Sequence, residues 1–567
     1  MRVFVGLAAI AAVLALGAGS GAARTAQATV GVYPSGTSFS ATGAAPAHPA
    51  AAASLAMPIG GVDDATILVS GAQHVAVRSA TIDSPLQLKL LFAHFVSVNG
   101  TPVPDALESW DGSQRATEQT NQPVWLQVTV PAGTAPGTYH GSVELAGDGP
   151  PTTVPITVTV YDVTLPAPGS TAGALLTAFN VNPQSYGAEV NKLYGISGKD
   201  SLPGLFSFLA GYRISPNNWG YGNPKAKSGY TSAGFWAQDR AGQMVSAVGE
   251  SRRFAAMWVP IANNRSTKSG WPGGLSPYKP QTWCSYLRSV RGFWQDHGWL
   301  AGSYPYTYAM DEPGANLYPV VRRQAAAAHS CFPGSHVVMT GKPSSANKVL
   351  WNGGSDDVDV FAVLESRYYG EYTVPLQQRQ HINRATMFLR EINAARRRGK
   401  QIWAYTYESR AHQTPGLDAV EPVADPRMFA DWAALEGITG LLRGQGLTTY
   451  SSGASPLVSN DKDGEYVLIY PGRDAPIPSA RLEVLREGIE DWEILHVVKQ
   501  RHGQKAVVKL LSSLFSTTKS GAKLSCVVGC AIKAKQPYSW PLWSKSATTA
   551  TKLAQMRVAA LRSAARG

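Results

Sequence analysis

The sequence predicts an α/β protein built on a TIM-type (β/α)8 barrel, with a β-sandwich before it and a small strand-plus-helices region after it. Three observations support this fold class. Eight apolar runs alternate with helical stretches between residues 172 and 447, short strands with frequent turns precede them, and a strand followed by a helical pattern comes after them. The length of 567 residues also indicates several domains rather than one core.

Residues 1–28 have the pattern of a secretory signal peptide. Arg2 supplies the positive start, residues 3–16 form an apolar stretch, and residues 26–28 (AQA) offer a small-residue cleavage site. The alternative is an uncleaved N-terminal anchor. No later stretch has the length and hydropathy of a membrane span. We therefore expect a secreted or cell-surface protein with no integral membrane span after signal cleavage.

Residues 29–58 are predicted to be a linker, because residues 41–58 (ATGAAPAHPAAAASLAMP) are rich in Ala and Pro and lack periodicity. Residues 59–168 are predicted to be the β-sandwich, which ends at a Pro- and Gly-rich boundary near residues 165–169. Its clearest strands are residues 124–130, 138–145 and 153–160.

Residues 169–450 are predicted to form the barrel. The eight strand-like runs are residues 172–179, 212–215, 254–261, 304–310, 336–340, 358–364, 401–407 and 438–442. The second run is the weakest strand pattern, since it ends at the breaker Pro216. Helices are predicted between the runs, for example over residues 283–297 and 317–329.

Residues 451–567 are predicted to be mostly helical, after a strand at residues 466–470 and a Pro-Gly turn. In the first helix Leu482, Leu485, Ile489 and Trp492 recur at helical spacing and form one apolar face. We interpret the charged residues on this amphipathic helix as structural pairs. These are Arg486, Glu490, Asp491 and Glu493.

The composition, 44% hydrophobic and 16% charged, is that of a globular protein. The net charge of +12 is compatible with nucleic acid, an anionic surface or an acidic polymer as partner. The densest basic run, residues 396–400 (RRRGK), lies at the end of a predicted helix, where cations complement the helix dipole. We therefore predict no nucleic-acid partner.

The four cysteines fit an exported protein. Cys526 and Cys530 are close enough to close a small loop, and Cys284 and Cys331 would then pair across the helices flanking the strand at residues 304–310. Four cysteines allow three pairings, so the connectivity stays open. We predict no metal and no cofactor, because the sequence has no CxxC, no HExxH, no GxSxG and no phosphate loop.

The most informative segment is residues 304–314 (YPYTYAMDEPG), in which a β run ends in two acids, Asp311 and Glu312. In a TIM barrel the carboxyl ends of the strands face the active site. Cleavage of a glycosidic bond needs an acid for the leaving oxygen and a second group to manage positive charge at the anomeric carbon. Neighbouring strand residues diverge, so this pair does not suit the usual opposed acid and nucleophile.

An adjacent pair suits substrate-assisted hydrolysis, with Glu312 as general acid/base. Asp311 would hold the N–H of a 2-acetamido group, whose carbonyl oxygen attacks the anomeric carbon. Strand alternation puts Tyr306 and Tyr308 on the Glu312 side, where they could stack on a sugar or bind the acetamido carbonyl. The structural alternative is a helix N-cap, since an acid followed by Pro often begins a helix.

Further candidates follow other predicted strands. Glu365 ends the sixth run, and Tyr407 and Glu408 end the seventh; these side chains could line the pocket. If the sugar lacks an acetamido group, Glu365 or Glu408 could be the nucleophile opposite Glu312. The alternative is a rim salt bridge with a neighbouring arginine.

Two loop residues complete the set of substrate-binding candidates. Asn180 follows the first run, and Trp219 follows the second. Trp219 could be a sugar platform or a packing residue.

Four segments resemble glycoside hydrolase family 123, the retaining β-N-acetylgalactosaminidases and their uncharacterised relatives with the same C-terminal domain. They are residues 136–141 (PGTYHG), 212–216 (YRISP), 304–313 (YPYTYAMDEP) and 470–493, with YPG, PIPSARLE and LREGIEDWE. The resemblance covers roughly residues 120–500 and is most specific in the last segment. It implies a sandwich, a barrel and a C-terminal region, with Asp311 orienting the acetamido group and Glu312 as acid/base.

One position departs from the family pattern. Relatives carry aromatic residues where the last barrel strand ends, whereas residues 440–446 here read GLLRGQG. The change to Arg443 and Gln445 favours a different sugar, acidic or larger, and makes Arg443 a substrate-binding candidate.

Three functions remain open from the sequence. The first is a secreted, exo-acting glycosidase on N-acetylhexosamine glycosides, retaining through the substrate's acetamido group. The second is a glycosidase on a non-acetamido sugar with a protein carboxylate as nucleophile. The third is a non-catalytic glycan-binding surface protein. A glycan is the expected partner in all three, and the sequence does not indicate an oligomeric state.

Overall fold

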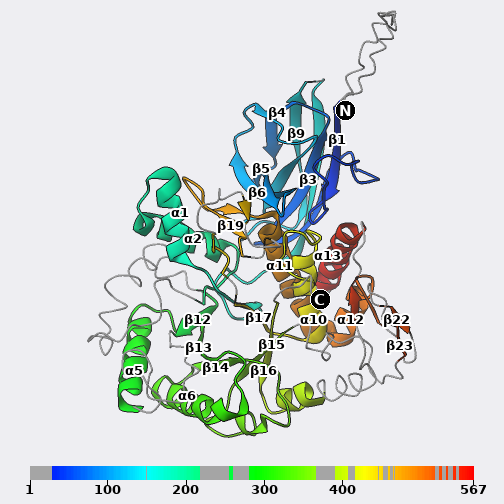
Figure 1. Cartoon of the computed structure of the whole chain (residues 1–567). Coiled ribbons are helices and arrows are strands. Elements are labelled where there is room, and N and C mark those ends of the chain that lie inside the picture. Colours follow the sequence, from blue (N-terminus) through cyan, green and yellow to red (C-terminus); the bar gives the residue numbers. More distant parts are fainter. Residues whose placement is uncertain are drawn as a thin grey trace, which may run out of the picture.

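The computed structural model divides the chain into a β-rich N-terminal part, a parallel barrel and a set of helices beside both (Figure 1). It describes residues 28–148, 150–217, 254–259, 280–364, 390–406, 415–444, 446–450, 458–459, 464, 466–517, 523–525, 531–533, 541–543 and 548–566. The predicted signal peptide up to residue 27 and the candidates Trp219, Glu365, Tyr407 and Glu408 lie outside these residues, as do Gln445, Cys526 and Cys530.

The N-terminal part consists of two sheets that share one core. The first sheet contains β1 (Thr29–Pro34), β3 (Val62–Ser70), β8 (Asn121–Thr129) and β5 (Gln87–Val98) in that order, with β6 (Thr101–Trp110) and β18 (Val458–Ser459) also paired to β5. The second contains β2 (Ala53–Ile59), β10 (Thr152–Thr164), β9 (Gly137–Gly147), β4 (His74–Ile82) and β7 (Arg115–Ala116). Alternate residues such as Val124, Leu126 and Val128 of β8 pack against Val154, Ile156 and Val158 of β10. This alternation across two sheets confirms the β-sandwich.

The predicted linker at residues 29–58 is wrong, because this segment contributes β1 and most of β2. β1 pairs antiparallel with β3, and β2 pairs parallel with β10. Leu55 and Met57 of β2 are buried in the sandwich core. Ala and Pro dominate the local composition and have low strand propensity, so pairing with distant strands overrides it.

Among the described residues, the barrel is a nearly closed parallel sheet of seven strands, which confirms the predicted α/β barrel fold. The order is β11 (Leu176–Phe179), β17 (Gly440–Arg443), β16 (Gln401–Tyr405), β15 (Val360–Leu364), β14 (His336–Thr340), β13 (Tyr304–Met310) and β12 (Ala256–Val259). Side chains alternate between an inner core that includes Tyr306, Val338 and Trp403 and an outer core shared with the helices. The carboxyl ends of all seven strands open on one face.

The second predicted run, residues 212–215, is not a regular strand. Residues 213–217 nevertheless occupy the gap beside β11: the Phe179 N–H donates to the Ser215 carbonyl, and the Asn217 N–H donates to the Phe179 carbonyl. Ser215 Oγ accepts the Ala256 N–H of β12 at 3.1 Å. Pro216 lacks an N–H and Arg213 has a φ of +60°, so this position cannot form a regular ladder.

Helices surround the barrel and cover its outer core. They are α1 (Pro183–Tyr194), α2 (Gly198–Gly211), α5 (Pro280–Asp296), α6 (Tyr318–Cys331) and α10 (Asp425–Glu436), with short 3-10 turns at η2 (Ala315–Leu317) and η3 (Lys348–Leu350). A disulfide joins Cys284 of α5 to Cys331 of α6, which confirms this predicted pairing. Among the described helices, none combines the length and the hydropathy that crossing a membrane requires.

The described part of the C-terminal region contains three helices and three two-stranded sheets. The helices are α11 (Ala480–His502), α12 (Gln504–Leu511) and α13 (Thr549–Ala565). The two-stranded sheets pair β19 (Ile469–Tyr470) with β20 (Ile477–Pro478), β21 (Phe515–Thr517) with β24 (Pro541–Trp543), and β22 (Lys523–Ser525) with β23 (Ala531–Lys533).

Helix α11 lies between the sandwich and the barrel (Figure 1) and is buried on every side from Ala480 to Leu495. Its Leu482 and Leu485 join the barrel's outer core, as the sequence predicts. Its opposite face, with Val484, packs on the outer face of the first sandwich sheet. The expected solvent-facing side of an amphipathic helix is therefore absent from this part of α11, and its charged residues need buried partners.

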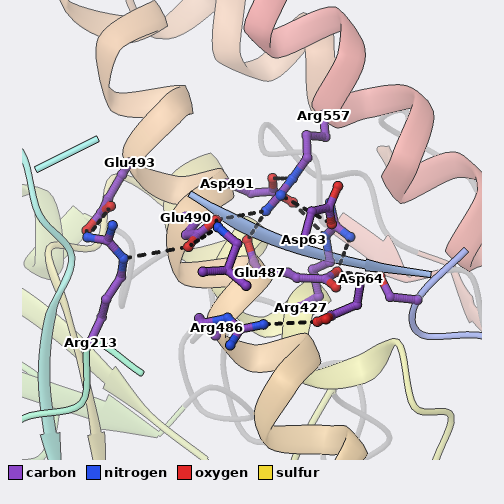
Figure 2. Close-up of polar contacts among 12 residues, drawn as sticks. Asp63, Asp64, Arg213, Arg427, Arg486, Glu487, Glu490, Asp491, Glu493 and Arg557 are labelled. Atoms are coloured by element: carbon purple, nitrogen blue, oxygen red, sulfur yellow. Dashed lines mark hydrogen bonds and ion pairs between the residues drawn. The ribbon is translucent and has the colours of Figure 1, made fainter. Parts of the chain in front are cut away.

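Those partners come from all three parts of the chain (Figure 2). Asp491 of α11 accepts one hydrogen bond from Arg427 of α10 and another from Arg557 of α13, each 2.6 Å long. Arg486 donates to Asp64 of β3 at 3.0 Å. The prediction that these helix charges are structural pairs is confirmed. The segment around α11 thus joins sandwich, barrel and C-terminal helices through buried ion pairs.

Glu493 makes the stability of these buried contacts around α11 depend on pH. Burial raises its pKa from 4.5 to about 8, against the opposing charge of Arg213, whose guanidinium lies 3.0 Å away, and with support from Glu490. Between these two values the folded chain holds a proton that the unfolded chain has released, so the free energy of unfolding falls as pH rises.

We expect this slope to depend on Glu493 itself. Glu493→Gln keeps the size of the side chain and removes the titration. The melting temperature of the wild type should fall relative to that of the variant as pH rises from about 5 to about 8. Thermal melts of both proteins across that range test this. A wild-type melting temperature that keeps a constant offset from that of the variant, or that rises relative to it as pH increases, contradicts the prediction.

Candidate active site

The predicted acids lie where β13 ends, but the strand reaches them through a distortion. The β13–β14 register shifts between Tyr308 and Met310. Ala309 and Met310 both pack in the outer core. Glu312 has a φ of +39°, in the left-handed region that side chains other than Gly rarely adopt. The expected simple alternation from Tyr308 to Glu312 is therefore wrong, because a bulge intervenes.

The bulge brings Tyr308 to Asp311 instead. The Tyr308 hydroxyl lies 3.0 Å from Asp311 Oδ1. Burial raises the pKa of that hydroxyl well above its ordinary value, and the charge of Asp311 adds to the rise. Tyr308 therefore stays protonated and acts as a hydrogen-bond donor to the carboxylate.

Thr340, the last residue of β14, connects the two acids. Its hydroxyl donates to Asp311 Oδ1 at 2.8 Å and accepts the Glu312 N–H at 2.7 Å. The same oxygen lies 3.0 Å from the Tyr308 hydroxyl. The Asp311 carboxylate and the Glu312 backbone are thus held from one point on the neighbouring strand.

The N-cap alternative for the two acids is wrong. The helical segment begins at η2, after Gly314, and that cap makes no side-chain hydrogen bond. Asp311 instead accepts the hydroxyl protons described above.

Glu312 opens into a pocket of about 230 Å³ at the carboxyl ends of β13–β16. Its described lining includes Thr340, Lys342, Asn347 and Tyr405. The Tyr405 hydroxyl donates to Glu312 Oε1 at 2.5 Å. This arrangement can present the Glu312 carboxyl group to a substrate oxygen while the Tyr405 phenol holds Oε1 in place.

The other candidates that the structure describes are buried in the barrel or bond to its backbone. Tyr306 is fully buried in the inner core and packs edge-on to Trp403, with ring centroids 5.7 Å apart. Asn180 donates its side-chain amide to the Gly444 carbonyl at 2.7 Å. Arg443, at the end of β17, is 1% exposed and follows Leu442 of the inner core.

Sequence reasoning missed Thr340 and Tyr405. Both are polar residues that end barrel strands, which is the signal that identified Asp311 and Glu312. The seventh run was expected to continue to residue 407, whereas β16 ends at Tyr405. The predicted strand end was therefore two positions late, so the sequence pointed to Tyr407 instead of Tyr405. Within the described ranges, no group of His, Cys, Asp and Glu is arranged to hold a metal ion.

Two protein-family models match this chain. The model of the glycoside hydrolase 123 catalytic domain matches residues 263–498, and that of the glycoside hydrolase 123 N-terminal domain matches residues 88–147. Together they match just over half of the chain and include Asp311, Glu312, Thr340 and Tyr405. No curated protein sequence matches.

Among solved structures, a family 123 glycoside hydrolase from Clostridium perfringens, described for glycolipid glycan hydrolysis, matches with a TM-score of 0.59 at 14% identity. The match covers 95% of this chain and 99% of that one. A β-glucuronidase from Parabacteroides merdae has a TM-score of 0.28 at 8% identity, over 76% of this chain and 50% of that one. β-Glucuronidase 3 from Bacteroides uniformis has a TM-score of 0.28 at 11% identity, over 77% and 51%.

The clostridial structure has a similar fold over 95% of the chain, and the two family models match a segment of the N-terminal part and a segment that includes most of the barrel. The chain therefore belongs to glycoside hydrolase family 123, and it is a glycoside hydrolase.

Proposed function

We propose that this glycoside hydrolase is a secreted, exo-acting enzyme that cleaves N-acetylhexosamine glycosides with retention, through the 2-acetamido group of the substrate. One observation carries the proposal. Asp311 and Glu312 are held together by Thr340, and Glu312 is the one carboxylate among the described residues that line the pocket. Two adjacent acids on one side suit a substrate nucleophile better than a protein nucleophile, which would have to face Glu312 across the sugar.

The proposed reaction has two steps. Glu312 donates a proton to the glycosidic oxygen while the acetamido carbonyl oxygen attacks the anomeric carbon, and the aglycone leaves as an alcohol. Asp311 accepts a hydrogen bond from the acetamido N–H as positive charge develops on the oxazolinium ion. Glu312 then takes a proton from water, whose oxygen attacks the anomeric carbon. The bond from that carbon to the acetamido oxygen breaks, which opens the oxazolinium ring and restores the acetamido group. Two inversions leave the configuration retained.

The described part of the pocket supports exo action. Its volume of about 230 Å³ lies below the roughly 300–1,000 Å³ of sites that hold drug-sized ligands. A space of this size suits one terminal sugar better than an internal segment of a chain. The proposed secretion depends on the N-terminal signal pattern, and N-terminal sequencing of the exported protein would test it.

A panel of aryl glycosides tests the reaction. We expect hydrolysis of aryl N-acetyl-β-galactosaminides or glucosaminides, and no hydrolysis of matched glycosides that lack the acetamido group. A thiazoline that mimics the oxazolinium ion should inhibit competitively, because it occupies the same pocket as the intermediate.

The alternatives predict different outcomes. Turnover of non-acetamido sugars alone would favour a protein nucleophile, for which Glu365 and Glu408 are the candidates. Glycan binding without turnover of any panel member would favour a binding protein. Proton NMR of the first-formed anomer tests retention, and an inverted product would exclude acetamido participation.

A further inference from the structure

The two proposed working acids are consecutive residues, and consecutive strand residues normally point to opposite faces. Here the bulge and the left-handed backbone of Glu312 interrupt that alternation, and one residue, Thr340, contacts both acids. A left-handed conformation at a Glu persists only when surrounding structure holds it. A contact with the Glu312 backbone would hold it directly.

Thr340 makes that contact. An amide N–H can only donate, so the Thr340 oxygen accepts from Glu312 N–H and its own proton goes to Asp311 Oδ1. One hydroxyl thus sets the backbone of one acid and the side chain of the other. The Tyr308 hydroxyl lies 3.0 Å from both the Thr340 hydroxyl and Asp311 Oδ1.

The position of the Thr340 hydroxyl is itself well defined. Thr340 is 2% exposed and pairs in parallel register with Ala362 of β15. Its β-branched side chain has few rotamers. The barrel sheet therefore fixes the position of one oxygen atom that contacts both acids.

We propose that Thr340 is the positioning residue for both carboxylates, selecting the left-handed conformation of Glu312 and orienting Asp311 toward the substrate amide. The proposal rests on the proposed function, since it assigns Thr340 a part in that same reaction. Thr340 acts through Asp311 and Glu312 and performs no proton transfer of its own.

The test compares two substitutions at one position with a control on the next strand. Thr340→Val keeps the shape and removes the hydroxyl, whereas Thr340→Ser keeps the hydroxyl. Thr307→Val is the matched control, because Thr307 of β13 is equally buried and its hydroxyl has no hydrogen-bond partner among the described residues. Kinetics use the aryl N-acetyl-β-hexosaminide that the wild type turns over.

Misplacing acid groups lowers the rate of the chemical step more than it weakens binding. We expect Thr340→Val to lower kcat by about 10²-fold with KM changed by less than about threefold. Thr340→Ser should retain kcat within about fivefold, and Thr307→Val should match the wild type. Thr340→Val should melt about a few degrees below Thr307→Val, because it leaves hydrogen-bonding groups unpaired that Thr307 does not contact. A cooperative melt well above the assay temperature then separates positioning from loss of folding.

Three results would overturn the proposal: wild-type kcat in Thr340→Val, equal losses in Thr340→Val and Thr340→Ser, or a rise in KM with kcat unchanged, which would make Thr340 a binding residue. If the wild type hydrolyses no panel member, the proposed function fails separately. Crystal structures of the wild type and Thr340→Val then decide the positioning role. Glu312 should leave the left-handed region in the variant, and its staying there refutes the inference.

Discussion

Glu312→Gln is expected to lower kcat on aryl N-acetyl-β-hexosaminides by about 10²–10⁴-fold, the usual contribution of a positioned general acid/base. Glutamine has the shape of the glutamate and can still accept the Tyr405 hydroxyl that now contacts Oε1. It cannot deliver a proton to the leaving oxygen or remove one from water. The loss should therefore fall on the chemistry, while the melting temperature stays that of the wild type.

The leaving group sharpens this experiment. A dinitrophenyl aglycone needs little protonation, so Glu312→Gln should retain more activity on it than on a methyl or sugar aglycone. Asp311→Asn is the companion variant: it should lose activity with every leaving group, because its proposed partner is the acetamido N–H. Equal losses across leaving groups in Glu312→Gln would contradict the role of general acid.

Arg427→Met is expected to lower the free energy of unfolding by about 3–5 kcal/mol, the range for breaking a buried ion pair by removing one partner. Arg427 is 2% exposed and lies between two carboxylates of α11, Glu487 and Asp491 (Figure 2). Methionine leaves both acids buried with one cation fewer. The effect should spread beyond α10, because Asp491 also bonds Arg557 of α13.

An exposed arginine provides the control. Arg78 lies 3.8 Å from Glu144 on the sandwich surface, with its side chain 60% exposed. Arg78→Met should change stability by no more than about 1 kcal/mol. Thermal and denaturant unfolding of the two variants are compared at the first transition, since a protein of several parts need not unfold in one step. An Arg427→Met melting temperature as close to the wild type as that of Arg78→Met would contradict the prediction.

Most of the barrel could be predicted from the sequence. The runs at residues 304–310 and 336–340 coincide with β13 and β14, because fully buried parallel strands are continuous apolar runs with abrupt ends. The run at residues 212–215 was predicted to be a strand but is not a regular one. Its backbone makes hydrogen bonds to β11, whereas Pro216 prevents a continuous ladder. Strand β2 was missed because residues 41–58 have the composition of a linker, and only its pairing with β10 makes it a strand. Strand β1 (TVGVYP) was included in that linker although its own residues suit a strand, and it pairs with β3.

The sequence by itself determined the chemical groups of this protein: a barrel, and at the end of one strand the adjacent acids Asp311 and Glu312. The tertiary structure decided how they are used. Thr340 and Tyr405 reach Asp311 and Glu312 from strands 29 and 93 positions further along the chain, and only the barrel register brings them there. Likewise, the charges of α11 have the pattern of a solvated helix face, until β3, α10 and α13 enclose them. Local sequence specifies strand and helix by periodicity, whereas contacts between distant positions depend on how the elements pack.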